Sequence, residues 1–157
     1  MLGYLQAKPD QDISEQFNGV HCEGRLQRID SKSPAQLWVD VGHNEDAARA
    51  LADFFSRQHQ MNRIVVLLGM LADKNVEQFV SCLKPVVDEW WLLGLDCERG
   101  LSASQLAQRV SGQIRVSQHF DNINQALKHA VLSLNNQDIL LVTGSFMTVE
   151  AVLSSSV

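Results

Sequence analysis

Short apolar runs alternate with segments of helical periodicity along most of the chain. The apolar runs are rich in branched and aromatic side chains and end in polar residues or glycine, which is typical of strands. We expect strands at residues 37–41, 63–68, 89–93, 114–117 and 138–143. Apolar residues at helical spacing follow each run, and we expect helices at residues 46–57, 76–83, 103–110, 122–132 and 146–153.

The expected strands are apolar on both faces and alternate with the expected helices. Strands of this kind pair in parallel and are covered by helices on both sides. The pattern therefore predicts a doubly wound, Rossmann-like α/β domain with three layers and a mostly parallel sheet. A further strand within residues 24–29 can pair antiparallel at one edge, which makes a six-stranded sheet.

Local signals refine the boundaries. Ser102 and Gln105 form a Ser-x-x-Gln capping box at a helix start, and Asp121 is expected to cap the helix that begins at residue 122. Residues 1–22 are polar and weakly patterned, and we interpret them as the remnant of an interdomain linker or of a helix of a preceding domain. The α/β domain is expected to span residues 23–157.

Composition and charge exclude several classes of protein. The formal net charge is −5, and no run of Lys or Arg is long enough to follow a phosphate backbone, which argues against nucleic-acid binding. No segment approaches the ~20 apolar residues of a membrane span, and the first residues do not resemble a signal peptide. Cys22, Cys82 and Cys97 form no CxxC pair, so neither disulfides nor a zinc site are indicated. We expect a cytoplasmic protein with reduced thiols and no metal ligands.

Doubly wound domains bind ligands where strands end and helices begin, and three such loops carry polar residues. The first is Asp40-Val-Gly-His-Asn44. Asp40 can accept hydrogen bonds from sugar hydroxyls, and His43 and Asn44 lie near a helix N-terminus, where phosphate is favoured. The structural alternative is that Asp40 caps the helix and His43 packs on the surface.

The other two loops follow the strands at 63–68 and 138–143. Gly69-Met-Leu-Ala-Asp-Lys-Asn75 lacks the second glycine of a P-loop, and Asp73 as a helix cap with Lys74 as a solvated charge is the alternative to a site. Thr143-Gly-Ser-Phe-Met-Thr148 offers free N–H groups and hydroxyls that suit a carboxylate or phosphate, unless Ser145 acts only as a cap. Because the fold brings the strand ends together, the three loops indicate a ligand site more strongly than each alone.

Taken in order, these segments resemble the C-terminal domain of the bifunctional folylpolyglutamate synthase/dihydrofolate synthase family, within the Mur ligase superfamily. The resemblance covers roughly residues 13–157 and rests on the order and spacing of five segments. They are Gly24-Arg-Leu-Gln27, Asp40-Val-Gly-His-Asn44 with Ala47-Ala48, Gly69-Met-Leu-Ala-Asp-Lys74, Glu98-Arg-Gly100 and Gly144-Ser-Phe-Met-Thr-Val149. The family's domain has a six-stranded sheet with one antiparallel strand, which agrees with the pattern described above.

The resemblance implies an ATP-dependent amide ligase. In such enzymes ATP converts the carboxylate of dihydropteroate or a folate into an acyl phosphate, and the amino group of L-glutamate displaces the phosphate. The N-terminal domain of the relatives holds the P-loop, Mg²⁺ and most of the folate site, and the C-terminal domain closes over it. Because this chain has no P-loop, we expect it to be inactive alone and to need its own N-terminal P-loop domain.

The resemblance also implies roles for individual residues. Arg25 and His43 are the expected catalytic residues, beside the reacting phosphate, where the charge of Arg25 offsets charge that develops in the transition state. The expected nucleotide contacts are Arg25, Asp40, His43 and Asn44, with Asp40 on the ribose. The expected contacts to L-glutamate are Ser145, Asp73 and Lys74.

Two residues depart from the family's pattern. Glu45 replaces the usual proline and brings negative charge near the expected phosphate, although it suits a helix N-terminus. Met147 stands where bacterial relatives often have histidine, which alters the expected glutamate pocket. The alternative hypothesis is a non-catalytic α/β module that binds a nucleotide or an amino acid. A dinucleotide-binding protein is less favoured, because no Gly-x-Gly-x-x-Gly follows any expected strand.

Overall fold

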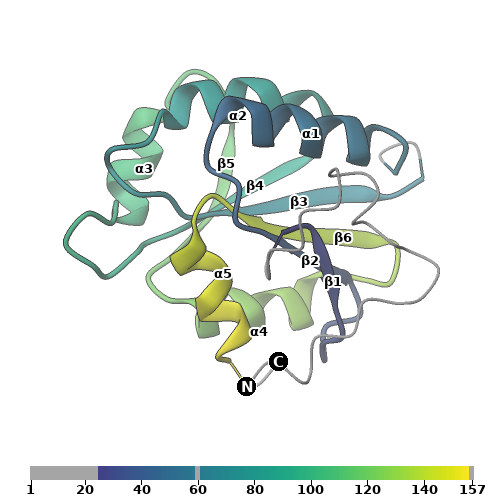
Figure 1. Ribbon diagram of the computed structural model, residues 1–157. Coiled ribbons are helices and arrows are strands. Elements are labelled where there is room, and N and C mark those ends of the chain that lie inside the picture. Colours follow the sequence, from purple (N-terminus) through teal and green to yellow (C-terminus); the bar gives the residue numbers. More distant parts are fainter. Residues whose placement is uncertain (1–24, 59–60, 156–157) are drawn as a thin grey trace.

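The computed structural model describes residues 25–58 and 61–155 (Figure 1). The interpretation of residues 1–22 as a linker remnant therefore lies outside the described residues. The strands are β1 (Gln27–Ile29), β2 (Gln36–Asp40), β3 (Arg63–Leu68), β4 (Glu89–Leu93), β5 (Val116–Phe120) and β6 (Asp138–Thr143). The helices are α1 (Glu45–Ser56), α2 (Val76–Leu83), the short 3-10 helix η2 (Lys84–Val86), α3 (Ala103–Arg109), α4 (Ile123–Ser133) and α5 (Phe146–Leu153).

The strands of the described residues form one six-stranded sheet in the order β1-β2-β6-β3-β4-β5. β1 pairs antiparallel with β2, and all other neighbours pair in parallel. The predicted fold class, including the antiparallel edge strand, is confirmed. Because β6 lies between β2 and β3, the loops that follow these three strands are neighbours although they are far apart in the sequence.

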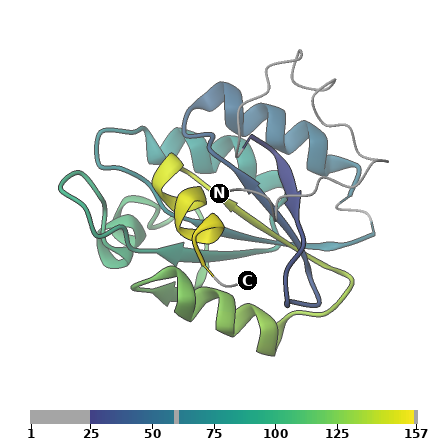
Figure 2. The same cartoon turned by 60° about the horizontal axis from the view of Figure 1, so that its bottom comes forward.

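Two hydrophobic cores lie on opposite faces of the sheet. Alternate residues of a strand point to opposite faces. Ile64 and Val66 of β3 therefore belong to the core under α1, α2 and α3, whereas Val65 and Leu67 belong to the core under α4 and α5. Figure 1 shows the first three helices above the sheet and the other two below it, and the turned view in Figure 2 brings α4 and α5 forward. The four β3 side chains are fully buried, and the removal of each from water stabilises the fold by about 1.5–3 kcal/mol.

The helices begin at side chains that cap their first turns. The predicted capping box of α3 is confirmed, because Ser102 Oγ accepts the Gln105 N–H at 3.1 Å and Gln105 Oε1 accepts the Ser102 N–H at 2.9 Å. The prediction that Asp121 caps α4 is wrong. Asn122 is the cap, and its Oδ1 accepts the Gln125 N–H at 3.0 Å. A cap serves the N–H three residues later, and the first turn of α4 starts one residue further along than the sequence indicated.

The strand predicted at residues 114–117 is misplaced. β5 begins at Val116, which is the register partner of Trp90, and the ladder continues to Phe120 after an irregularity. Ile114 packs against the core under α1 to α3 from the irregular segment that precedes β5. Its apolar character therefore did not signal strand pairing.

Candidate functional site

The last residues of β2, β6 and β3 lie side by side. Asp40 of β2 is the register partner of Thr143 of β6, and Thr143 is the partner of Leu68 of β3. Hydrogen bonds link the loops that follow: the Gly69 N–H donates to the Thr143 carbonyl at 3.2 Å, and the Thr143 hydroxyl donates to the Gly42 carbonyl at 3.4 Å. The three predicted loops therefore leave the sheet at one edge and contact one another.

Asp40 is buried at this edge, with 2% of its surface exposed. Its Oδ2 accepts the Leu26 N–H at 2.8 Å, and its Oδ1 accepts the Gly42 N–H at 2.6 Å. Burial raises the pKa of Asp40, and these two backbone hydrogen bonds and the charges of Arg25 and His43 offset part of that increase. The carboxylate therefore joins the segment before β1 to the loop after β2.

Arg25 and His43 are next to the two residues that Asp40 binds: Arg25 precedes Leu26, and His43 follows Gly42. Arg25 is exposed and immediately precedes Leu26, whose φ of 30° is unusual for a residue other than glycine. His43 is half-buried, and its Nδ1 lies 3.2 Å from the Val41 carbonyl oxygen. The structure thus brings Arg25, Asp40 and His43 together, as the resemblance implied, while their roles stay predictions.

Asn44, not Asp40, caps α1. Asn44 Oδ1 accepts the Ala47 N–H at 2.9 Å, so the alternative in which Asp40 is the cap is wrong. Asn44 itself is exposed. The next residue, Glu45, forms an ion pair with Arg49 one turn along the helix. That ion pair reduces the negative charge that Glu45 brings to the predicted phosphate position.

Asp73 and Lys74 lie in the loop between β3 and α2. Asn75 caps α2, since its Oδ1 accepts the Gln78 N–H at 3.1 Å, and the alternative in which Asp73 is the cap is wrong. Asp73 Oδ2 lies 3.7 Å from Lys74 Nζ and 3.5 Å from an Arg99 guanidinium nitrogen. The loop therefore presents Lys74 and Asp73, and Arg99 adds a second cation from the segment between β4 and α3; all three side chains are at least partly exposed.

Ser145 is the cap of α5, and its hydroxyl is engaged within the protein. Its Oγ accepts the Thr148 N–H at 3.0 Å and lies 2.8 Å from Thr148 Oγ1, and only 3% of Ser145 is exposed. The N–H groups of Phe146 and Met147 precede the first intrahelical bond of α5 and are the donors that a helix start offers to a ligand. The cap is confirmed, and it leaves the backbone beside Ser145 as the part that suits a carboxylate.

Three residues that support the site were not singled out from the sequence. Thr148 is fully buried and donates from Oγ1 to the Gly69 carbonyl at 2.9 Å, which fixes the second loop to α5. Gly144 has a φ of 112°, and a Cβ there would lie 2.4 Å from the Gly69 carbonyl oxygen. Arg109 bonds the second loop from α3. Gly144 and Thr148 lie within the third predicted loop but received no role of their own, and no local signal pointed to Arg109.

The edge suits an anionic ligand. The N-termini of α1, α2 and α5 all follow the three strand ends, and each carries the positive end of a helix dipole. Arg25, Lys74 and Arg99 add positive side chains. Among residues 25–58 and 61–155 no group of three or more His, Cys, Asp or Glu side chains is arranged to hold a metal ion. No helix in that part of the chain is long and apolar enough to cross a membrane.

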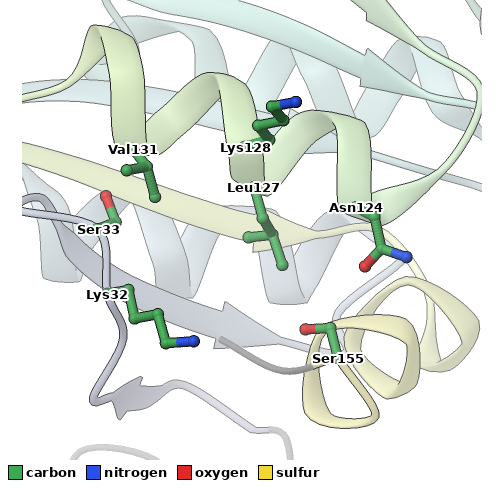
Figure 3. Close-up of a pocket in the computed structure, with 7 residues that line it drawn as sticks. All are labelled: Lys32, Ser33, Asn124, Leu127, Lys128, Val131 and Ser155. Atoms are coloured by element: carbon green, nitrogen blue, oxygen red, sulfur yellow. The ribbon is translucent and has the colours of Figure 1, made fainter.

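A hollow of about 200 Å³ lies elsewhere, between α4, the turn before β2 and the end of α5 (Figure 3). The residues that line it are Lys32, Ser33, Asn124, Leu127, Lys128, Val131 and Ser155. None of the predicted site residues lies among them, so this hollow plays no part in the site.

Comparison with protein families identifies the family of this domain. The family model for the Mur ligase, glutamate ligase domain, matches residues 24–146. The chain belongs to this family. The predicted membership of the Mur ligase superfamily is thereby confirmed.

The relatives of this chain include the dihydrofolate synthase/folylpolyglutamate synthase of Escherichia coli K12. It is 35% identical over 130 residues, which cover 83% of this chain and 29% of that protein. The bifunctional folylpolyglutamate synthase/dihydrofolate synthase of Yersinia pestis, complexed with AMPPNP and Mn, has 32% identity and a TM-score of 0.73, and the match covers 85% of this chain and 31% of that one.

A further structure of such a synthase, with Mn, AMPPNP and L-glutamate bound, has 34% identity and a TM-score of 0.74. The match covers 85% of this chain and 31% of that chain. The chain therefore spans under a third of the length of these relatives.

Proposed function

We propose that this chain is the C-terminal domain of an ATP-dependent amide ligase that adds L-glutamate to dihydropteroate or to folates. The observation that carries the proposal is the match in sequence and fold to a synthase crystallised with Mn, AMPPNP and L-glutamate. The sheet edge supports it independently, because three helix N-termini and several cations suit a triphosphate and an amino-acid carboxylate.

In this proposal the first loop faces the nucleotide. The guanidinium of Arg25 offsets the charge that develops on the transferred phosphoryl group, and His43 and the N-terminus of α1 lie beside it. Asn44 contributes a further polar contact. Asp40 has one free lone pair on each oxygen for a ribose hydroxyl, since each oxygen already accepts one backbone N–H.

The second and third loops face L-glutamate. Lys74 offers a positive charge for one carboxylate, and Asp73 offers a negative charge for the amino group. The N–H groups at the start of α5, held in place by the capping hydroxyl of Ser145, accept the other carboxylate. Glutamate bound in this way presents its amino nitrogen to the activated carboxylate, and this orientation is the domain's main contribution to rate.

The remaining parts of the ligase belong to a preceding domain. By the resemblance to these synthases, we place the metal, the P-loop and most of the folate site in an N-terminal P-loop domain. We propose that the ligase acts in the cytoplasm, where the free cysteines Cys82 and Cys97 stay reduced.

Oxygen transfer tests this proposal. The chain is joined behind the N-terminal two-thirds of the Escherichia coli relative and is supplied with ATP, Mg²⁺, L-glutamate and dihydropteroate whose carboxylate carries ¹⁸O. One carboxylate oxygen attacks the γ-phosphorus and ADP leaves. The glutamate nitrogen then attacks the acyl carbon and the C–O bond breaks, so the labelled oxygen departs with phosphate. We expect ¹⁸O in inorganic phosphate, whereas label in AMP or unlabelled phosphate beside labelled amide product would contradict it.

A further inference from the structure

Arg109 holds the loop between β3 and α2 from outside. It is the last residue of α3, and its guanidinium donates to the Ala72 carbonyl at 3.0 Å and to the Lys74 carbonyl at 2.9 Å. The same group donates to both carboxylate oxygens of Glu77, in the first turn of α2, at 2.9 and 2.8 Å. One side chain therefore bonds the loop on both sides of Asp73, with charge-assisted hydrogen bonds.

A second support holds the other side of the same loop. The Ala72 N–H donates to the Arg99 carbonyl at 2.7 Å, and the Leu101 N–H donates to the Met70 carbonyl at 3.2 Å. Leu71 and Gly100 thereby form an isolated antiparallel bridge. The backbone that carries Asp73 and Lys74 is thus fixed between the segment at residues 99–101 and Arg109.

The arrangement is more than a surface ion pair. Arg109 and Glu77 have side-chain exposures of 29% and 40%, and a pair this exposed contributes little to stability because water and salt screen it. Arg109 lowers the pKa of Glu77, so the carboxylate stays charged and keeps the guanidinium in place. A guanidinium anchored in this way can bond two carbonyls at fixed directions, which an ammonium group cannot.

We propose that Arg109 is a positioning residue for L-glutamate. By bonding the Ala72 and Lys74 carbonyls it fixes the direction in which Asp73 and Lys74 meet the substrate. This inference rests on the proposed function, in which that loop contacts glutamate. Arg109 itself touches neither glutamate nor the reacting atoms.

Amide hydrogen exchange of the 157-residue chain tests the structural half of the proposal. R109K keeps the charge and R109A removes it, and R115A is the matched control, because Arg115 is exposed at the opposite edge of the sheet. The Ala72 and Lys74 N–H groups donate to the Arg99 and Leu71 carbonyls, so their exchange reports how often the loop opens. We expect both amides to exchange at least about tenfold faster in both Arg109 variants, because the loop opens more often once its carbonyls lose the charge-assisted bonds from the guanidinium. Amides of β3 and β6 should keep their protection from exchange in all three variants. If R109A fails to fold, the comparison rests on R109K alone.

Steady-state kinetics of the joined ligase test the functional half. We expect R109K to raise KM for L-glutamate by about tenfold or more while KM for ATP stays unchanged, because only the glutamate loop is displaced. R115A should change neither constant.

The outcomes separate this inference from the proposed function. Unchanged exchange of the Ala72 and Lys74 amides in R109A and R109K would overturn the role of Arg109. Faster exchange with an unchanged KM for L-glutamate would reduce it to a structural residue and overturn positioning. A joined wild-type protein that folds but makes no product would count against the proposed function instead, and the exchange result would then decide alone whether Arg109 holds the loop.

Discussion

The Asp40 carboxylate accepts the Leu26 N–H at 2.8 Å, across fourteen positions of sequence. Leu26 is fully buried and has a φ of 30°, a conformation that costs free energy in a residue with a side chain. The hydrogen bond therefore holds a strained residue directly after Arg25. The direction of the exposed Arg25 and the shape of the loop at Gly42 depend on the same carboxylate.

Replacement of Asp40 by asparagine tests this link. D40N keeps the size of the side chain but turns an NH₂ group toward one of the two backbone donors. We expect a loss of about 1–3 kcal/mol in the free energy of unfolding. The loss should lie toward the lower end, because the substitution also removes a buried charge that is costly to keep away from water. Urea denaturation measures the loss, and D30N, at an exposed position, should change stability by less than ~0.5 kcal/mol. A D40N chain as stable as the wild type would contradict the link.

Gly144 allows β6 and β3 to approach each other at the site. Its φ of 112° is accessible to glycine, and a Cβ would lie 2.4 Å from the Gly69 carbonyl oxygen and 2.8 Å from side-chain atoms of Leu68 and Met70. Gly112 is a matched control, because its φ is 82° and no atom lies within 4 Å of a Cβ there. We expect G112A to cost about 1–2 kcal/mol for the backbone alone, and G144A to cost roughly 1–3 kcal/mol more because of the overlap.

Thermal unfolding of both alanine variants separates the two contributions. Similar losses in G112A and G144A would show that the close approach of Gly144 to Gly69 adds nothing to the cost of the backbone conformation.

Glu89 lies at the start of β4, at the end of the sheet opposite the site, and makes the stability of the domain depend on pH. Burial raises the pKa of Glu89, but hydrogen bonds from Trp91 and Ser117 and its contact with Arg63 outweigh that effect and lower it below the ordinary value of 4.5. A carboxyl group whose pKa is lower in the folded state stabilises the fold above its unfolded pKa. That stabilisation is lost as pH falls through the folded pKa.

We therefore expect E89Q to be less stable than the wild type near pH 7, and the difference to shrink as pH falls below the ordinary value of 4.5. Urea denaturation at a series of pH values measures it. E150Q, at an exposed position of α5, serves as the control and should follow the wild type. A stability difference between E89Q and wild type that does not vary with pH would refute the assigned cause.

The sequence predicted the fold because its strongest signals are local. The apolar runs at residues 63–68, 89–93 and 138–143 coincide with β3, β4 and β6, since these strands are buried on both faces and their pattern is unambiguous. Ile114 misled the prediction of β5, because a side chain can enter the core from an irregular segment beside a strand. Asp121 misled the start of α4, since two adjacent residues were equally good caps.

The site was predictable only in part. Parallel topology places Asp40, Leu68 and Thr143 in one row, and polar strand ends could therefore be identified. Two hydrogen bonds of the site join segments that are distant in sequence: the Leu26 N–H donates to Asp40, and the Thr148 hydroxyl donates to the Gly69 carbonyl. No local pattern reports such contacts, and Arg109 was missed for the same reason.

The most direct test of the central claim is the mass of the folate product after incubation with ATP, Mg²⁺ and L-glutamate. The chain alone, the chain joined behind the N-terminal two-thirds of the Escherichia coli relative, and the joined protein with H43A are compared. We predict a product heavier by one glutamyl residue from the joined protein, none from the chain alone, and a much lower yield from H43A. A well-folded joined protein that yields no glutamylated product would contradict the assignment of this domain to a glutamate-adding ligase.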